Sequence, residues 1–168
     1  MTPQAPTDLA RSRPVPPVPL CRRILVAHDL SRSGADIFSR ALSIAQDAGA
    51  RLFLAHVDDP SRENAIGFVP AESYERWAKD RQEYVRRLFG PLVAQARKNG
   101  VEAEVLALVG SSVGELLKAA QDQGADLIVV GFHHYRWWIE RFFRCNTAVD
   151  LLKFAPCSVL VIPVSPDE

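Results

Sequence analysis

Four histidines stand at or just after the ends of short apolar segments with the composition of β-strands: His28, His56, His133 and His134. Imidazole, carboxylate and thiolate groups are ligands of transition metals, so these histidines together with Asp29 and Cys145 have the chemistry of a metal site. Their spacing does not support one, because the sequence has no H-x-x-H or H-x-x-x-H pair. We therefore expect structural or surface histidines and no bound metal.

Two further segments suit a phosphate or a nucleoside. Residues 110–114 (GSSVG) stand between a strand-like and a helix-like segment, where free N–H groups and hydroxyls can hold a phosphate. The alternative that we expect there is a capping box, with Ser112 and Glu115 closing the first helical turn. Asp29 ends the first apolar segment, and it can accept from a ribose or an adenine, bind a metal, or cap the next turn. The sequence leaves these roles of Asp29 open.

Motifs of common nucleotide-dependent enzymes are missing from the sequence. It contains no G-x-x-x-x-G-K-[ST] phosphate loop and no G-x-G-x-x-G after the first strand. No paired acid and base stands out, and we expect no nucleophilic-serine hydrolase. The sequence therefore predicts a protein that is not an enzyme and that needs no cofactor.

The charge and hydropathy of the chain exclude several kinds of partner. Twenty Lys and Arg residues balance twenty Asp and Glu residues over 168 residues, so the formal net charge is zero. A neutral chain lacks the general positive field that nonspecific nucleic-acid binding needs, and a local basic patch is the alternative that stays open. No apolar run approaches the ~18–20 residues of a membrane span. We expect one globular domain that binds neither nucleic acid nor membrane.

Two segments differ from the rest in composition. Residues 1–20 hold six of the twelve prolines, which predicts a disordered proline-rich tail, with a ligand for an SH3-like partner as the alternative. This tail has no apolar core of a secretory signal, so we expect a cytoplasmic protein with reduced thiols. Residues 132–144 hold two of the three tryptophans and three arginines. We expect them to begin an amphipathic helix rather than to stack on bases or to enter a membrane surface.

From residue 21 onward, strand-like and helix-like segments alternate. Short runs rich in Val, Ile and Leu predict strands, and stripes of apolar residues at helical spacing predict helices. The expected strands are 23–29, 51–57, 101–105 at an edge, 126–131 and 158–162; the expected helices are 37–48, 72–99 with a kink or break at Gly90 and Pro91, one after 112, and 140–154. Units of about 30 residues predict a parallel sheet with helices on both faces. Ligands of such sheets bind at the carboxyl ends of the strands, here after Asp29, Val57, Leu108 and Gly131.

Five pieces of the sequence resemble the universal stress protein A family: residues 24–31, 48–52, 56–57, 124–131 and 155–163. The resemblance covers about residues 21–165 and leaves 166–168 as a C-terminal tail. It implies a Rossmann-like fold of the adenine nucleotide alpha hydrolase type, with strand order 3-2-1-4-5. It also implies a homodimer, a role in stress survival, and other universal stress proteins or a regulatory protein as partners.

ATP-binding members of this family carry G-x2-G-x9-G-[ST] after the fourth strand, and this sequence departs from that pattern. Gly131 is present, His134 takes the second glycine position, and Arg144 or Cys145 takes the third. These larger side chains should keep the backbone away from a phosphate, as in the family branch that lacks the motif. The family positions for a nucleotide are Ala27, Asp29, Val57, Gly131, Cys145 and Asn146. We expect no ATP binding, while weak binding of AMP stays open.

The fifth strand predicts a dimer interface. It is apolar on both faces and carries no charge, yet the expected strand order places it at an edge, where an unpaired apolar strand invites a second chain. The residues expected in the interface are Ser158, Val159, Leu160, Val161, Ile162 and Val164. The alternative is a monomer in which residues 137–143 or the tail cover this edge.

Three functions follow from these observations. We expect a non-enzymatic, dimeric regulatory module. One alternative is a nucleotide sensor in which Arg136 or Arg144 replaces the glycines, and another is a small nucleotide hydrolase or metal-dependent enzyme at Asp29 and the histidines. The strand order also places Cys21 and Cys157 about 9–10 Å apart, too far for a disulfide bond.

Overall fold

The computed structural model describes residues 21–60, 71–133 and 147–164. Five strands alternate with four helices in this part of the chain, as the sequence predicts. They are β1 (Arg23–Ala27), α1 (Arg32–Ala48), β2 (Arg51–Asp58), α2 (Ala71–Lys98), β3 (Ala103–Val109), α3 (Ser112–Asp122), β4 (Leu127–His133), α4 (Thr147–Phe154) and β5 (Ser158–Val164).

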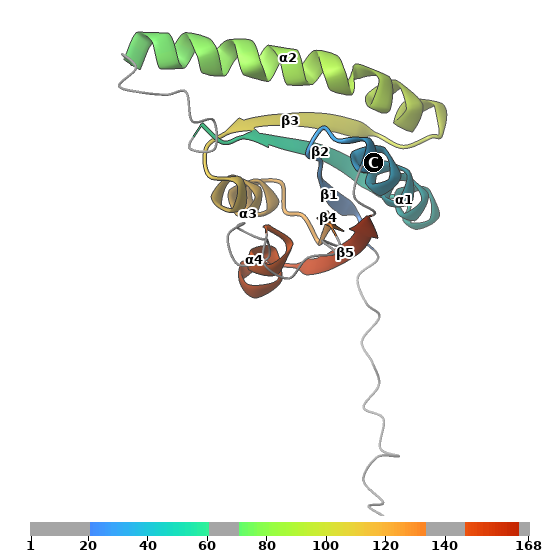
Figure 1. The fold of residues 1–168 in the computed structure, drawn as a ribbon. Coiled ribbons are helices and arrows are strands. Elements are labelled where there is room, and N and C mark those ends of the chain that lie inside the picture. The colour runs from blue at the N-terminus through green and yellow to red at the C-terminus, as the bar shows by residue number, and fades with distance from the viewer. Residues whose placement is uncertain (1–20, 61–70, 134–146, 165–168) are drawn as a thin grey trace, which may run out of the picture.

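The five strands form one parallel sheet in the order β3-β2-β1-β4-β5, which confirms the predicted fold (Figure 1). Ala27 of β1 aligns with Ala55 of β2 on one side and with Val130 of β4 on the other. The chain leaves β1 toward β2 and β3, and later returns to place β4 and β5 on the other side. The strand order therefore reverses beside the carboxyl end of β1, which is where ligands of such sheets bind.

Helices cover both faces of the sheet and divide the core in two. Ile24 and Val26 of β1 belong to a cluster with residues of α1 and α2, whereas Leu25 belongs to a cluster with residues of α3 and α4. Successive side chains of a strand point to opposite faces. Because both faces are covered, the central strands are apolar on both faces except near their ends.

Several predicted element boundaries differ from those of the structure. β1 ends at Ala27 rather than at 29, α1 begins at Arg32 rather than at 37, and β4 and β5 extend to His133 and Val164. The third strand spans Ala103–Val109 rather than 101–105, since its second half pairs with β2 as far as Asp58. The capping box at Ser112 does not form: the N-cap of α3 is Ser111, whose side chain makes no capping bond, and Ser112 is already helical. Gly110 precedes the helix with a φ of 146°, a conformation that favours glycine.

Helix α2 runs from Ala71 to Lys98 with Pro91 inside it, so the alternative of a break at Gly90 and Pro91 is wrong. Buried Val85 and Phe89 hold the helix on the sheet just before Pro91, and buried Ala96 follows it. The expected helix 140–154 is described from Thr147, and its residues 140–146 lie outside the described part.

No helix in the described segments is long and apolar enough to cross a membrane. The thiols of Cys21 and Cys157 are free, and they precede β1 and β5, two strands that β4 separates. Burial, and then the Asp126 carboxylate, raise the pKa of Cys157, which favours its protonated thiol form.

Candidate functional site

The turn after β1 brings the ring of His28 against helix α1. His28 is buried, its backbone N–H donates to the Ala55 carbonyl, and its Nδ1 accepts from the Leu30 backbone N–H at 3.0 Å. Leu30 has a φ of 65°, the only positive φ of a non-glycine residue in the described chain. The ring lies so close to Gly34 that a Cβ atom there would overlap with it. The turn is therefore fixed by its own side chain.

The surroundings of His28 shift the pKa of its ring. Burial lowers the pKa of His28 from the ordinary value of 6.5, the Asp29 carboxylate raises it, and His56 lowers it further. In the neutral ring Nδ1 is the acceptor for Leu30, so the proton sits on Nε2. The ring of His28 therefore has a structural role in the turn, one of the two roles, structural or surface, that the sequence left open for the histidines.

Asp29 caps the turn that leads into α1. Its Oδ1 accepts from the Ser31 backbone N–H at 3.1 Å and from the Ser31 hydroxyl at 2.6 Å. Ser31 is the N-cap of α1, and its Oγ in turn accepts from the Gly34 backbone N–H. Of the roles left open by the sequence, the capping role is thus present in the structure. Asp29 itself is exposed to solvent at the carboxyl edge of the sheet.

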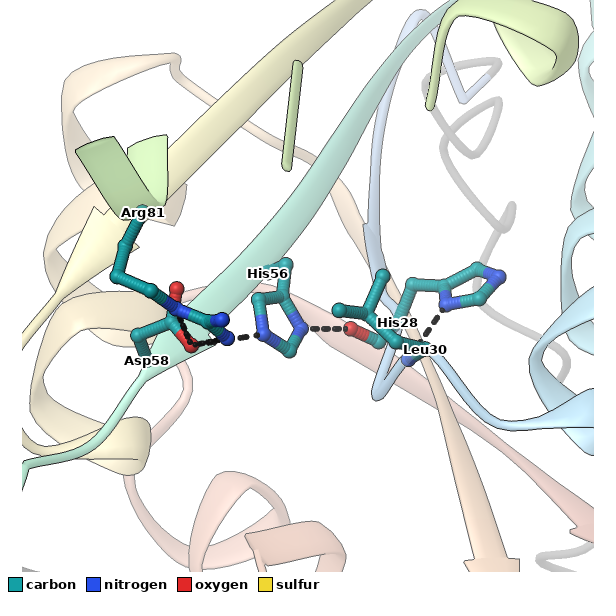
Figure 2. Close-up of polar contacts among 5 residues, drawn as sticks. All are labelled: His28, Leu30, His56, Asp58 and Arg81. Atoms are coloured by element: carbon teal, nitrogen blue, oxygen red, sulfur yellow. Dashed lines mark hydrogen bonds and ion pairs between the residues drawn. The ribbon is translucent and has the colours of Figure 1, made fainter. Parts of the chain in front are cut away.

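A second polar chain crosses from helix α2 to the turn after β1, as Figure 2 shows. Arg81 of α2 donates to Oδ1 of Asp58 through Nη2 at 2.6 Å and through Nε at 3.2 Å. His56 lies beside this pair, with its Nε2 3.6 Å from the same oxygen. Its Nδ1 bonds to the His28 carbonyl at 2.8 Å, so this nitrogen carries the proton. These polar contacts therefore connect α2 to the carboxyl ends of β2 and β1.

Asp58 and Arg81 are site residues that the sequence analysis missed as a pair. Asp58 is only 6% exposed, so its carboxylate needs a charged partner. The sequence did contain a sign of the buried carboxylate. Alternate residues of a strand share a face, and the face of β2 that begins with the apolar residues Leu52 and Leu54 ends with Asp58. Nothing in the sequence pointed to Arg81 as the partner, because the contact spans two elements.

The family positions on the described strands lie at one edge of the sheet. Ala27 and Val57 are half-buried and pack against the cluster on the α3 and α4 side. Gly131 lies on the other face, where a Cβ atom would overlap with Cδ1 of Ile37 in α1. Gly131 therefore has a packing reason to be glycine. Cys145 and Asn146, like His134 and Arg144, lie outside the described residues.

The serine-rich turn at residues 110–114 does not have the geometry of a nucleophile elbow, and a carboxylate lies beside its first glycine. Its letters also fit G-x-S-x-G, but a nucleophile elbow places the serine in a strained turn, and Ser112 lies in the regular helix α3. The Glu115 side chain lies against Gly110, where its carboxyl group sits about 3.0 Å from the position of a Cβ atom. A carboxylate at this helix start opposes the binding of a phosphate.

The described residues contain no group of three or more His, Cys, Asp and Glu side chains that could hold a metal ion. His28 and His56 use their Nδ1 atoms for backbone contacts, and Asp58 bonds to Arg81. The polar groups at this edge therefore support the shape of the turn and of α2.

Comparison with known proteins identifies the family of the chain. The model of the universal stress protein family matches residues 21–163. Universal stress protein MJ0531 of Methanocaldococcus jannaschii is 26% identical over 143 residues, which are 85% of this chain and 82% of that protein.

Two solved structures have the same fold. A universal stress family protein from Burkholderia pseudomallei superposes with a TM-score of 0.66 at 28% identity, over 86% of this chain and 98% of that chain. A universal stress protein in complex with cAMP superposes with a TM-score of 0.61 at 22% identity, over 86% and 98% of the two chains. With its strand order and this match along most of its length, the chain belongs to the universal stress protein family.

Proposed function

We propose that this protein is a non-enzymatic regulatory module that works as a homodimer joined through β5. The observation that carries the proposal is the apolar surface at the β5 edge. Of the seven large apolar side chains that are exposed in the described part, four lie on α4 and β5: Val149, Leu152, Phe154 and Leu160. Such a surface beside an unpaired strand favours a protein partner.

The pairing of β5 with a second copy would use the strand itself. Within the described residues, β5 pairs with β4 on one side and with no strand on the other. Along it, Ser158 and Leu160 are exposed, Val159 and Val161 are half-buried, and Ile162 and Val164 are buried in the core. A two-fold axis beside β5 would let two identical edges satisfy each other. The buried members of the predicted interface would then contribute through their backbone groups.

Hydrogen exchange tests this pairing directly. The outward N–H groups of β5 should become protected as the protein concentration rises, because each would then donate to the partner strand. The outward amides of β3, the other edge strand, serve as the control. Fast, concentration-independent exchange along β5 would refute the dimer.

The absence of enzymatic activity is supported by the roles of the polar residues at the carboxyl edge. His28, Asp29 and Asp58 each bond to a turn or to α2. We expect no hydrolysis of ATP or AMP above the uncatalysed rate, measured as released phosphate over hours. Turnover that is lost in Asp29→Asn would contradict the proposal.

A second candidate function is the sensing of an adenine nucleotide. Exposed Asp29 with half-buried Ala27 and Val57 stands where the strand order reverses, and one structural relative is a complex with cAMP. A thermal-shift screen with cAMP, AMP and ATP decides between the two functions, since a ligand of the native state raises its stability. We expect no shift with millimolar ATP, because His134 takes a glycine position. A micromolar Kd for ATP by calorimetry would refute this expectation.

A further inference from the structure

Helix α2 carries a stripe of large, exposed or half-buried side chains beside the face that packs on the sheet, and of its members Arg81 also bonds to Asp58 of β2. We call Tyr74, Trp77, Arg81, Tyr84 and Leu88 the α2 stripe. Tyr74, Tyr84 and Leu88 are 37%, 43% and 43% exposed, and they complete the seven exposed large apolar side chains of the described part. The buried side chains of α2, Val85, Phe89 and Ala96, point to another face of the helix.

The spacing of the α2 stripe is that of a helix-pairing seam. Its members follow one another at alternating intervals of three and four residues, the a and d pattern by which two helices pack side by side. The ring of Tyr74 contacts that of Trp77 with centroids 5.7 Å apart, and the Arg81 guanidinium lies 5.2 Å over the Tyr84 ring. Since Asp58 also holds Arg81 at 2.6 Å, the side chains of the stripe are ordered before any partner arrives.

The order of residues along the stripe identifies a second copy of the chain as the partner. The stripe is nearly symmetric about Arg81, with one aromatic or aliphatic side chain three or four residues away and another seven residues away on each side. In an antiparallel pair centred on Arg81, Tyr74 of one copy faces Leu88 of the other, and Trp77 faces Tyr84. The two Arg81 side chains then face each other at the centre of the pair, and Asp80, one position earlier in each copy, supplies an acid beside them. A parallel pair would instead place Tyr74 against Tyr74 and Leu88 against Leu88.

We propose that the α2 stripe is a second, isologous interface, through which two copies pack helix against helix. Figure 1 shows α2 at the opposite end of the molecule from α4 and β5, so one copy can use both surfaces at once. If the β5 dimer forms as well, two different two-fold contacts build a tetramer or a longer assembly. The α2 contact does not depend on the β5 contact, and the two can be tested separately.

Equilibrium sedimentation of the full chain at rising concentration tests the proposal. Tyr74→Glu and Leu88→Lys should each weaken the α2 contact by about tenfold or more, since each puts a charge against an apolar side chain. The double variant Tyr74→Glu/Leu88→Lys should regain most of the lost affinity, because positions 74 and 88 face each other across the antiparallel pair. Ala94→Glu is the control, since Ala94 is exposed on α2 outside the stripe.

The outcome separates this contact from the β5 dimer. In Val161→Lys, whose β5 edge is blocked, the α2 contact alone should still join two chains of 18.6 kDa each. If Tyr74→Glu and Leu88→Lys assemble as the wild type does at every concentration, the α2 interface is wrong, whatever β5 does. If both single variants dissociate and the double variant stays dissociated, the antiparallel arrangement is wrong. If only Val161→Lys changes the mass, the β5 dimer stands and the α2 interface falls.

Discussion

The turn after β1 requires glycine at position 34, because the His28 ring occupies the space that a side chain at this position would fill. A Cβ atom there would lie 2.6 Å from Nε2 of the ring. Gly34→Ala should lower the free energy of unfolding by about 1–3 kcal/mol, because the ring must move and lose its bond to Leu30. Urea denaturation measures the change.

Gly114→Ala is the matched control for this substitution. A Cβ atom at Gly114 meets Ser111 only at 3.8 Å, an ordinary contact in a helix. Alanine should therefore leave stability unchanged or raise it. An equal loss in both variants would show that the His28 contact is not the cause.

The buried His28 also predicts how stability depends on pH. Because burial lowers the pKa of the folded protein's His28 below 6.5, the unfolded chain binds a proton first as the pH falls. The free energy of unfolding should thus decrease below about pH 6.5, down to the folded-state pKa, and this contribution should be level above pH 6.5.

His28→Gln should flatten this slope below about pH 6.5, measured by urea denaturation at several pH values. Asp29→Asn removes a carboxylate that raises the pKa of His28, so the folded-state pKa of His28 falls further. In this variant the free energy of unfolding should therefore keep decreasing to a lower pH than in the wild type. An unchanged slope in His28→Gln would assign the pH dependence to other groups.

For individual residues, the sequence indicated that His28 and Asp29 lie at the candidate site, but it did not indicate which groups they contact. Asp29 and His28 were recognised because they end a strand, a position that periodicity alone reveals. The packing of His28 on Gly34 and the bond from Arg81 to Asp58 join segments that fold together only in space. Whether Asp29 caps a turn or accepts from a ligand depends on the Ser31 backbone, which no local pattern specifies.

Among the elements, α2 is joined to β2 by an ion pair with a buried carboxylate, Arg81 to Asp58. Arg81→Met would leave the Asp58 carboxylate buried without its guanidinium, and we expect a loss of about 2 kcal/mol. Hydrogen exchange in the helical residues before Arg81 should rise more than exchange near Phe89, which the core holds. Arg86→Met, at an exposed position of α2, should change neither quantity.

The double variant Asp58→Leu/Arg81→Met shows whether the stability lost in Arg81→Met comes from the buried, unpaired Asp58 carboxylate. Replacing both charges by apolar groups should recover part of the stability that Arg81→Met loses, because no buried charge remains. If Arg81→Met is as stable as the wild type, water or His56 satisfies Asp58 and the ion pair does not position α2.

The sequence predicted the existence and order of the strands and helices better than it predicted where each one begins and ends. Apolar runs and helical stripes identify segments, since burial imposes those periods on both sides of a covered sheet. The end of β3 was misplaced because Glu102 and Glu104 alternate with apolar residues, whereas Leu106 and Leu108 continue the strand against β2. The cap of α3 was misplaced by one residue because Ser111 and Ser112 both suit an N-cap, and only the backbone decides between them.

For the whole molecule, the strand order that the family resemblance implies is confirmed, and it leaves two surfaces with exposed apolar side chains. One lies on α4 and β5 and the other is the α2 stripe, at opposite ends of the sheet. The first could be predicted, because an uncharged strand at an edge is visible in the sequence. The second could not, because Tyr84 and Leu88 look like members of an ordinary core stripe until the fold shows that Val85 and Phe89 are the ones buried.

The β5 dimer is the central claim, and light scattering on two variants of the full chain, Leu88→Lys and Val161→Lys/Leu88→Lys, tests it most directly. A lysine at position 161, half-buried in β5, should place a charge within the paired edges and shift the equilibrium away from the β5 dimer. Leu88→Lys is included in both proteins so that the α2 contact does not mask the result. The account predicts two chains of 18.6 kDa in Leu88→Lys and one in Val161→Lys/Leu88→Lys, both folded by circular dichroism. A mass of one chain for Leu88→Lys at micromolar concentration, or of two chains for both variants, would contradict it.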